Sequence, residues 1–183
     1  MTGNTNHISI IALNVNGLNS SIKRNRVADL IKRKDPKNYC LQDTHLIDNH
    51  RLKVKEWGKK CHAHEHIKKA GVSLLISDNV DFKPNLVRRD KEGHFILLKG
   101  RINQQDIAII NIYAPNSGSS IYDKQILHNS RKQIDYNTIT LGDFNIPLTP
   151  LDRSSKKIEE TVHLKNTINN LDLTDIYRTY HST

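Results

Sequence analysis

The sequence predicts a single α/β domain with mixed β-sheets, and three observations carry this prediction. Short segments rich in β-branched and aliphatic residues are interspersed with segments whose apolar residues recur at helical spacing. Two strand-like segments, 95–102 and 106–113, are separated only by polar residues, which is typical of an antiparallel hairpin and not of a doubly wound parallel sheet. The length of 183 residues suits one hydrophobic core better than two.

Four elements are expected in the first half of the chain. Residues 8–13 are strongly apolar and β-branched, so they predict a strand. A helix follows, with Ser20 or Ser21 as its N-cap, and it ends before Pro36. Its apolar stripe consists of Val27, Leu30, Ile31 and Ile22. Two further strands are expected over residues 39–43 and 71–77.

After the hairpin the chain again alternates between helix and strand. Residues 123–134 predict a helix, because Ile126 and Ile134 lie eight apart on one face. The β-branched run 138–141 predicts a strand that extends to residue 145. A last helix over 156–171 is indicated by Ile158, Val162 and Ile168, and a last strand is expected to begin over 173–177.

Residues 50–69 carry many lysines around Trp57, the only tryptophan. Such a charge run is usually a solvated face, although a basic patch beside an aromatic residue also suits a nucleic-acid backbone. The run 61–66, Cys-His-Ala-His-Glu-His, has the composition of a metal site, but zinc sites normally combine two separated clusters. We therefore expect an exposed loop here.

Composition favours a polyanionic partner inside the cell. Lys and Arg number 28 against 19 acidic residues, which gives a formal net charge of +9 and favours nucleic acid ahead of an acidic membrane. Cys40 and Cys61 are too few for a disulfide framework, so a reducing compartment is expected. Residues 1–7 do not resemble a secretory signal, and no apolar run reaches the roughly 18 residues of a membrane span.

Several predicted strands end in polar, ligand-orienting residues. These are Asn14, Asp43, Tyr113, and the pair Asp143 and Asn145. Each one alone is better explained as a turn former. If the strands share a sandwich and their ends converge, the set forms a site of hard oxygen ligands, which suits Mg²⁺ and, in a basic protein, metal-assisted cleavage of a phosphate ester.

Four motifs in this order resemble the endonuclease/exonuclease/phosphatase superfamily. They are Leu-Asn-Val-Asn-Gly-Leu at 13–18, Leu-Gln-Asp-Thr-His-Leu at 41–46, Asn-Ile-Tyr-Ala-Pro-Asn at 111–116 and Leu-Gly-Asp-Phe-Asn at 141–145. More closely, nearly the whole chain resembles the endonuclease domain of long interspersed element retrotransposons, including Arg-Asp-Lys-Glu-Gly-His at 89–94 and Asp-Ile-Tyr-Arg at 175–178.

The resemblance implies a two-sheet sandwich flanked by helices, like that of deoxyribonuclease I, and a Mg²⁺-dependent nick in one DNA strand. The nick leaves a 3′ hydroxyl that primes reverse transcription. The roles that the resemblance implies are metal binding by Asp43, organisation of the metal site by Asn14, contact with the scissile phosphate by Tyr113, orientation or activation of the attacking water by Asp143, phosphate binding by Asn145, and DNA binding by Asn116 and Arg153. The parent protein is then expected to carry a reverse transcriptase and element RNA, in nucleus and cytoplasm.

Two departures from the family pattern imply a weak or inactive chain. The family has Glu where this chain has Asp43, and an acid one methylene shorter fits the strict geometry of Mg²⁺ less well than that of Mn²⁺. The family's later Asp and Ser-Asp-His segment are not found within residues 1–183, so the chain is expected to be a single, incomplete domain that lacks its last strands. Two alternatives remain open: a non-catalytic DNA-binding remnant, and a phosphoesterase acting on a phosphoinositide, sphingomyelin or poly(A).

Overall fold

The computed structural model describes residues 8–46, 52, 54, 57–64, 71–114, 119–146 and 158–180. The chain forms two compact units. The first comprises Met1–Tyr113 and Asn137–Asp143, and the second comprises Ala114–Tyr136 and Phe144–Thr183. Both four-stranded sheets belong to the first unit.

One sheet of the first unit has the strand order β1-β2-β4-β3. The strands are β1 (Ile10–Asn14), β2 (Asn38–Gln42), β3 (Lys59–His64) and β4 (Gly71–Ile76). β1 and β2 are parallel because the helix α1 (Ser21–Lys34) returns the chain to the starting edge, whereas β4 is antiparallel to both of its neighbours. The two strands and the helix expected over this part of the chain thus form a parallel β1-α1-β2 unit, which is followed by an antiparallel half.

The other sheet has the order β5-β6-β7-β8. Its strands are β5 (Phe82–Arg89), β6 (Phe95–Ile102), β7 (Gln105–Tyr113) and β8 (Thr138–Asp143). The predicted hairpin is confirmed: β6 and β7 are antiparallel, and Asn103 and Gln104 between them both have positive φ, as tight hairpin turns require. β8 pairs in parallel with β7.

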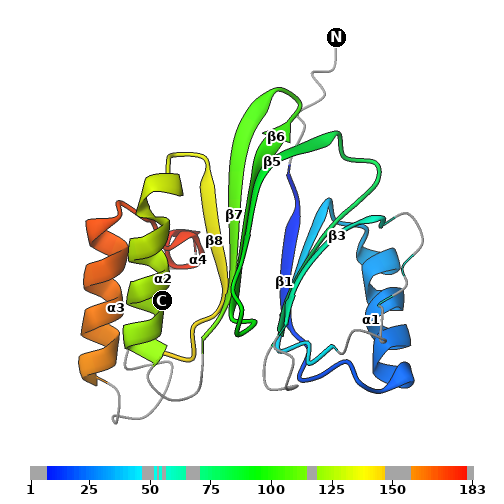
Figure 1. The fold of residues 1–183 in the computed structure, drawn as a ribbon, viewed down its shortest axis with the longest axis horizontal. Coiled ribbons are helices and arrows are strands. Elements are labelled where there is room, and N and C mark those ends of the chain that lie inside the picture. The colour runs from blue at the N-terminus through cyan, green and yellow to red at the C-terminus, as the bar shows by residue number, and fades with distance from the viewer. Residues whose placement is uncertain are drawn as a thin grey trace. The chain divides into compact units, whose positions relative to one another are not determined.

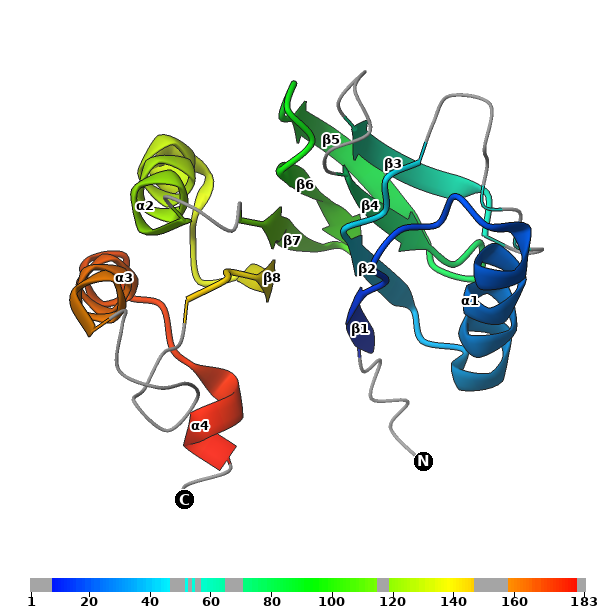
Figure 2. The ribbon, with the colours of Figure 1, turned by 90° about the horizontal axis from the view of Figure 1, so that it is seen from below.

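The two sheets face each other across an apolar core, and α1 covers the outer face of the first sheet (Figure 1, Figure 2). Side chains between the sheets include Leu74, Leu98 and Ile109, all nearly fully buried. On the other face, Ile31 of α1 packs with Tyr39 and Leu75. The strand ends are thus held by cores on both faces of the first sheet.

The second unit is helical. It contains α2 (Ser119–Ser130), a 3-10 turn η1 (Arg131–Gln133), α3 (Ile158–Asn170) and α4 (Ile176–Tyr180). α2 and α3 lie side by side in both views (Figure 1, Figure 2). None of the helices in the described parts of the chain is long and apolar enough to cross a membrane.

The prediction for residues 50–69 was wrong in part. Residues 59–64 form the edge strand β3 instead of a loop, and Trp57 is buried with its ring edge against Tyr39. Glu65 and His66 lie outside the described residues. Alternating polar residues concealed the strand, because only one side of an edge strand needs to be apolar.

The structure differs from the prediction in three other places: the unpredicted strand β5, the strand expected near the C-terminus, and the apolar faces of two helices. β5 was not predicted because Pro84 and four charged or amide residues dominate it; it is an edge strand with a bulge next to that proline. Residues 173–177 were expected to start a strand, but α4 begins there, with the Thr179 amide donating to the Asp175 carbonyl. Ile22 and Val162 are exposed instead of packed.

Ser20 is the N-cap residue of α1, although its side chain makes no capping hydrogen bond. The expected helix over 123–134 begins earlier, at Ser119, and gives way to η1 after Ser130. These are differences of helix boundary, which local residue preferences determine least well.

A buried polar network joins the two sheets just below the strand ends. Asn111 of β7 accepts a hydrogen bond from Nε2 of Gln42 at 2.6 Å, and its own amide donates to the carbonyls of Leu41 and Ser73, both at 3.1 Å. Asn111, Gln42 and Ser73 are each at most 2% exposed. Because buried polar groups are costly when unpaired, this network fixes how the sheets face each other.

Replacing Asn111 with Leu is expected to destabilise the protein by about 3 kcal/mol, because the carbonyls of Leu41 and Ser73 and the Gln42 amide lose a buried partner. Urea unfolding measures the change. Asn25→Ala, at an exposed position of α1, is the matched control and should stay within about 0.5 kcal/mol. Equal stability of Asn111→Leu and wild type would contradict this account of the network.

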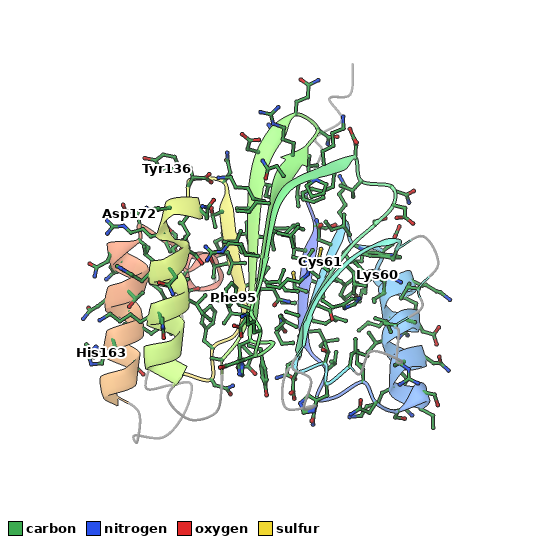
Figure 3. The ribbon with its side chains drawn as sticks, in the orientation of Figure 1. Lys60, Cys61, Phe95, Tyr136, His163 and Asp172 are labelled. Atoms are coloured by element: carbon green, nitrogen blue, oxygen red, sulfur yellow. The ribbon has the colours of Figure 1, made fainter. Side chains whose placement is uncertain are left out.

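The two cysteines are expected to differ in reactivity. Burial raises the pKa of Cys40 to about 12, so its thiolate fraction at pH 8 is roughly 1 in 10⁴. Cys61, on β3 (Figure 3), is only partly buried. A thiol reagent at pH 8 should modify Cys61 in the native protein and Cys40 only after unfolding. Rapid native modification of Cys40 in Cys61→Ser would show that this strand opens readily.

Candidate active site

Four of the predicted site residues converge at one end of the first unit. β1 and β2 run in parallel with Asn14 opposite Gln42, so Asp43 follows at the same end. β7 and β8 also run in parallel, and Tyr113 lies opposite Asp143. The tips of the two parallel pairs therefore bring together side chains that are up to 129 residues apart in sequence.

Asn14 bridges the two sheets. Its Nδ2 donates to Oδ2 of Asp143 at 2.8 Å, while its Oδ1 accepts the backbone N–H of Asn16 at 3.0 Å. With a donor on one side and an acceptor on the other, the two hydrogen bonds determine which way the carboxamide faces. Asn14 thus holds the Asp143 carboxylate in one orientation through Oδ2.

Asp43 lies just beyond β2 in a turn that the backbone stabilises. Its φ is +55°, and its carbonyl accepts the N–H of Gly17 at 2.7 Å. The side chain is only 12% exposed, and its Oδ1 is in contact with Nε2 of His45. His45 also has a positive φ, +48°, so the turn directs the imidazole back onto the acid two residues earlier.

The charges of both carboxylates, Asp43 and Asp143, act on the hydroxyl of Tyr113. Burial, the neighbouring Asp43 charge, a hydrogen bond from the hydroxyl to Asp43, and the Asp143 charge raise the pKa of Tyr113 to about 12. The phenol is therefore a neutral hydrogen-bond donor at physiological pH. Asp43, Tyr113 and Asp143 form one interacting group.

Gly142 permits the close approach of β8 to β7 at this end. Its φ is +140°, and a Cβ added there would collide with the carbonyl oxygen of Ile112. Only glycine combines that backbone angle with that contact. Gly142 is therefore needed to bring Asp143 level with Tyr113.

The donor set fits a hard divalent cation. Two carboxylates, Asp43 and Asp143, are combined with an amide and a phenol. The described residues contain no group of three or more His, Cys, Asp or Glu side chains that could hold a metal ion. Mg²⁺ is commonly held by one or two carboxylates and completed by water and phosphate oxygens. The chemistry suited to this arrangement is phosphate-ester hydrolysis.

Three predicted site residues, Asn145, Asn116 and Arg153, are not among these four. Asn145 is part of the second unit, where its side-chain amide donates to the carbonyl of Ala114 and its φ is +52°. Asn116 and Arg153 lie outside the described residues. Sequence reasoning missed two histidines: His45 contacts Asp43, and His94 contacts Tyr113. Both stand in the quoted motifs. The available signal was that His45 lies two residues from a predicted site residue and that His94 lies at the start of a predicted strand.

No protein-family model matches the chain. Among solved structures, it is similar to the AP endonuclease LMAP from Leishmania major, with 18% sequence identity and a TM-score of 0.75 over 94% of this chain and 69% of that one. An AP endonuclease from Archaeoglobus fulgidus matches with 22% identity and a TM-score of 0.70 over 94% and 74% of the two chains. The 3′ phosphatase NExo from Neisseria, bound to product DNA hairpin, matches with 20% identity and a TM-score of 0.73 over 97% and 76%.

These similarities confirm the predicted fold. The chain has the endonuclease/exonuclease/phosphatase fold, with two mixed sheets and flanking helices as in deoxyribonuclease I. At these identities the comparisons establish the fold, and the chemistry has to be argued from the site.

Proposed function

We propose that this chain is a DNA endonuclease domain of the retrotransposon type, which nicks one DNA strand and leaves a 3′ hydroxyl that primes reverse transcription. The observation that carries the proposal is the Asn14–Asp143 hydrogen bond between the sheets, beside the Asp43–Tyr113 pair. Together these contacts bring an oriented carboxylate (Asp143), a neutral hydrogen-bond donor (Tyr113) and a second carboxylate (Asp43) to one place, as phosphodiester hydrolysis requires.

Two further observations support DNA as the substrate. The net charge of +9 favours a polyanion, since cationic side chains gain free energy by releasing counterions from phosphates. The similar structures include two AP endonucleases and a 3′ phosphatase bound to a DNA hairpin. The motif resemblance adds the retrotransposon assignment, with a reverse transcriptase and element RNA as partners and with nucleus and cytoplasm as locations.

In the proposed reaction Asp43 would hold Mg²⁺, or Mn²⁺ in its place, and such an ion, when bound, would supply electrostatic polarisation of a phosphate oxygen. Asp143, held by Asn14, orients a water and accepts its proton as the water oxygen bonds to phosphorus. The bond from phosphorus to the 3′ oxygen breaks, so the 5′ phosphate remains on one fragment and the 3′ oxygen takes up a proton. The Tyr113 hydroxyl, whose one proton is donated to Asp43, would turn that proton to a non-bridging phosphate oxygen of the bound substrate. The motif resemblance assigns phosphate binding to Asn145 and DNA binding to Asn116 and Arg153.

A non-catalytic DNA-binding domain is the second candidate, and one observation favours it. Both His45 and Tyr113 engage the Asp43 carboxylate, so a cation must compete with two partners for the acid expected to hold it. Such a domain would bind DNA in a salt-dependent way and show no turnover.

Purified residues 1–183 are expected to nick supercoiled plasmid slowly with Mg²⁺ or Mn²⁺ and not with a chelator. Asp143→Ala should lower the rate by about 10² to 10⁴, because a positioned acid–base group is lost. The exposed α3 substitution His163→Ala is the control and should nick like wild type (Figure 3).

DNA binding without metal-dependent nicking, in protein that unfolds cooperatively, would favour the non-catalytic candidate. Release of phosphate from a phosphoinositide, or cleavage of sphingomyelin or poly(A), without DNA nicking would instead indicate another substrate on the same fold.

Lengthening the acid at position 43 is expected to improve use of Mg²⁺. Asp43→Glu restores the family's residue and brings a carboxylate oxygen about one methylene further out, so the rate with Mg²⁺ should rise relative to the rate with Mn²⁺. Asp43→Asn, of equal size and without the charge, should lose activity with both ions. A fall in the Mg²⁺ rate of Asp43→Glu would show that the shorter acid is matched to its site.

A further inference from the structure

The turn between β5 and β6 has no part in the reaction proposed above, yet it is built to present one side chain. Oδ2 of Asp90 accepts the backbone N–H of His94 at 3.0 Å, and the Asp90 N–H donates to the carbonyl of Phe95 at 3.1 Å. Gly93 has a φ of +82°, which closes the turn without strain. The backbone of His94 is therefore fixed at the start of β6.

His94 contacts Tyr113 in three ways. The Tyr113 N–H donates to the carbonyl of His94 at 2.7 Å, and Nδ1 of His94 lies 2.8 Å from the carbonyl oxygen of Tyr113. A carbonyl only accepts, so Nδ1 carries the proton in this arrangement. The two rings stack, with centroids 6.3 Å apart and planes inclined by 24°.

These contacts restrain the ring and backbone of Tyr113, whereas the site contacts its hydroxyl. At its far end the hydroxyl donates to the Asp43 carboxylate. A hydrogen bond at the hydroxyl alone leaves the ring able to turn about its own axis and to swing with the side-chain dihedral angles. A stacked neighbour whose own imidazole is hydrogen-bonded to the Tyr113 backbone restricts both motions.

We propose that His94 is a positioning residue, which holds the Tyr113 ring so that its hydroxyl stays directed at Asp43 and at the phosphate-binding side of the site. Its kinetic consequence rests on the proposed endonuclease function, whereas its structural part does not. The contacts divide the role in two: stacking orients the ring, and the Nδ1 hydrogen bond keeps the imidazole in place beneath it.

The experiment is ¹⁹F NMR of residues 1–183 with 3-fluorotyrosine at the six tyrosines, the Tyr113 signal being assigned by its loss in Tyr113→Phe. His94→Phe retains a ring for stacking, His94→Gln retains a donor, and His94→Ala retains neither. We expect the Tyr113 signal of His94→Ala to move furthest toward its position in unfolded protein, His94→Phe to remain nearest to wild type, and His94→Gln to lie between. His163→Ala, on α3, is the control and should leave the signal unchanged.

An unmoved Tyr113 signal in His94→Ala, or an equal shift of the other tyrosine signals, would overturn the proposal. If His94→Ala does not fold, the order of His94→Phe and His94→Gln decides in its place: a signal that moves more in His94→Phe than in His94→Gln contradicts the stacking role.

In nicking assays, kcat of His94→Ala should fall about 10-fold with KM changed less than 2-fold, because misplacement of a donor affects the transition state more than binding. His94→Phe should recover most of this loss. Absence of nicking in every form, wild type included, would count against the endonuclease function alone, since the NMR result still decides the role of His94.

Discussion

The hydrogen bond from Gln42 to Asn111 is the contact on which the geometry of the site depends. It crosses the core between the sheets, where Asn111 is fully buried and also donates to two carbonyls of the opposite sheet. Side chains two apart on a strand share a face, so Tyr113 points to the same side as Asn111. Asp43 follows Gln42 directly. The bridge therefore sets the distance between Asp43 and Tyr113 before either takes part in chemistry.

The strand ends are then refined by local backbone conformation. Positive φ at Asp43 and His45 turns the chain so that the imidazole lies on the carboxylate, and the tight passage of Gly142 over Ile112 brings Asp143 level with Tyr113. Residues in this region of φ/ψ space cost free energy that the surrounding structure must offset. Here the surrounding structure is the parallel pairing of β1 with β2 and of β7 with β8. The β1–β2 pairing continues past the strand ends, because the N–H groups of Gly17 and Leu18 donate to the carbonyls of Asp43 and Thr44.

The strands that lead to the site could be predicted from sequence because each is a short run of β-branched and aliphatic residues that ends at polar residues. β2 and β4, in the middle of their sheet, are buried along their whole length. β3 and β5 are sheet edges, half polar and, in β5, interrupted by Pro84, so the same rules missed them. α4 begins at Ile176, where β-branched neighbours suggested a strand, and the Asp175 carbonyl just before it accepts the N–H of Thr179.

The site itself was predictable only as a set of residue types. Asn14, Asp43, Tyr113 and Asp143 could each have been a turn residue, and their convergence needed the sheet order. The contacts of His45 and His94 depend on turn geometry that no residue pattern specifies, so neither histidine was expected to touch the site.

The most direct test of the central claim, that Asn14 and Asp143 act as one unit in metal-dependent cleavage of DNA, is a double-mutant cycle on plasmid nicking. Rates would be compared for Asn14→Ala, Asp143→Ala and the double variant in the presence of Mn²⁺. The account predicts that the double variant is no slower than Asp143→Ala, because Asn14 acts through the carboxylate that it orients. Losses that multiply, or wild-type nicking that is indifferent to metal, would contradict it.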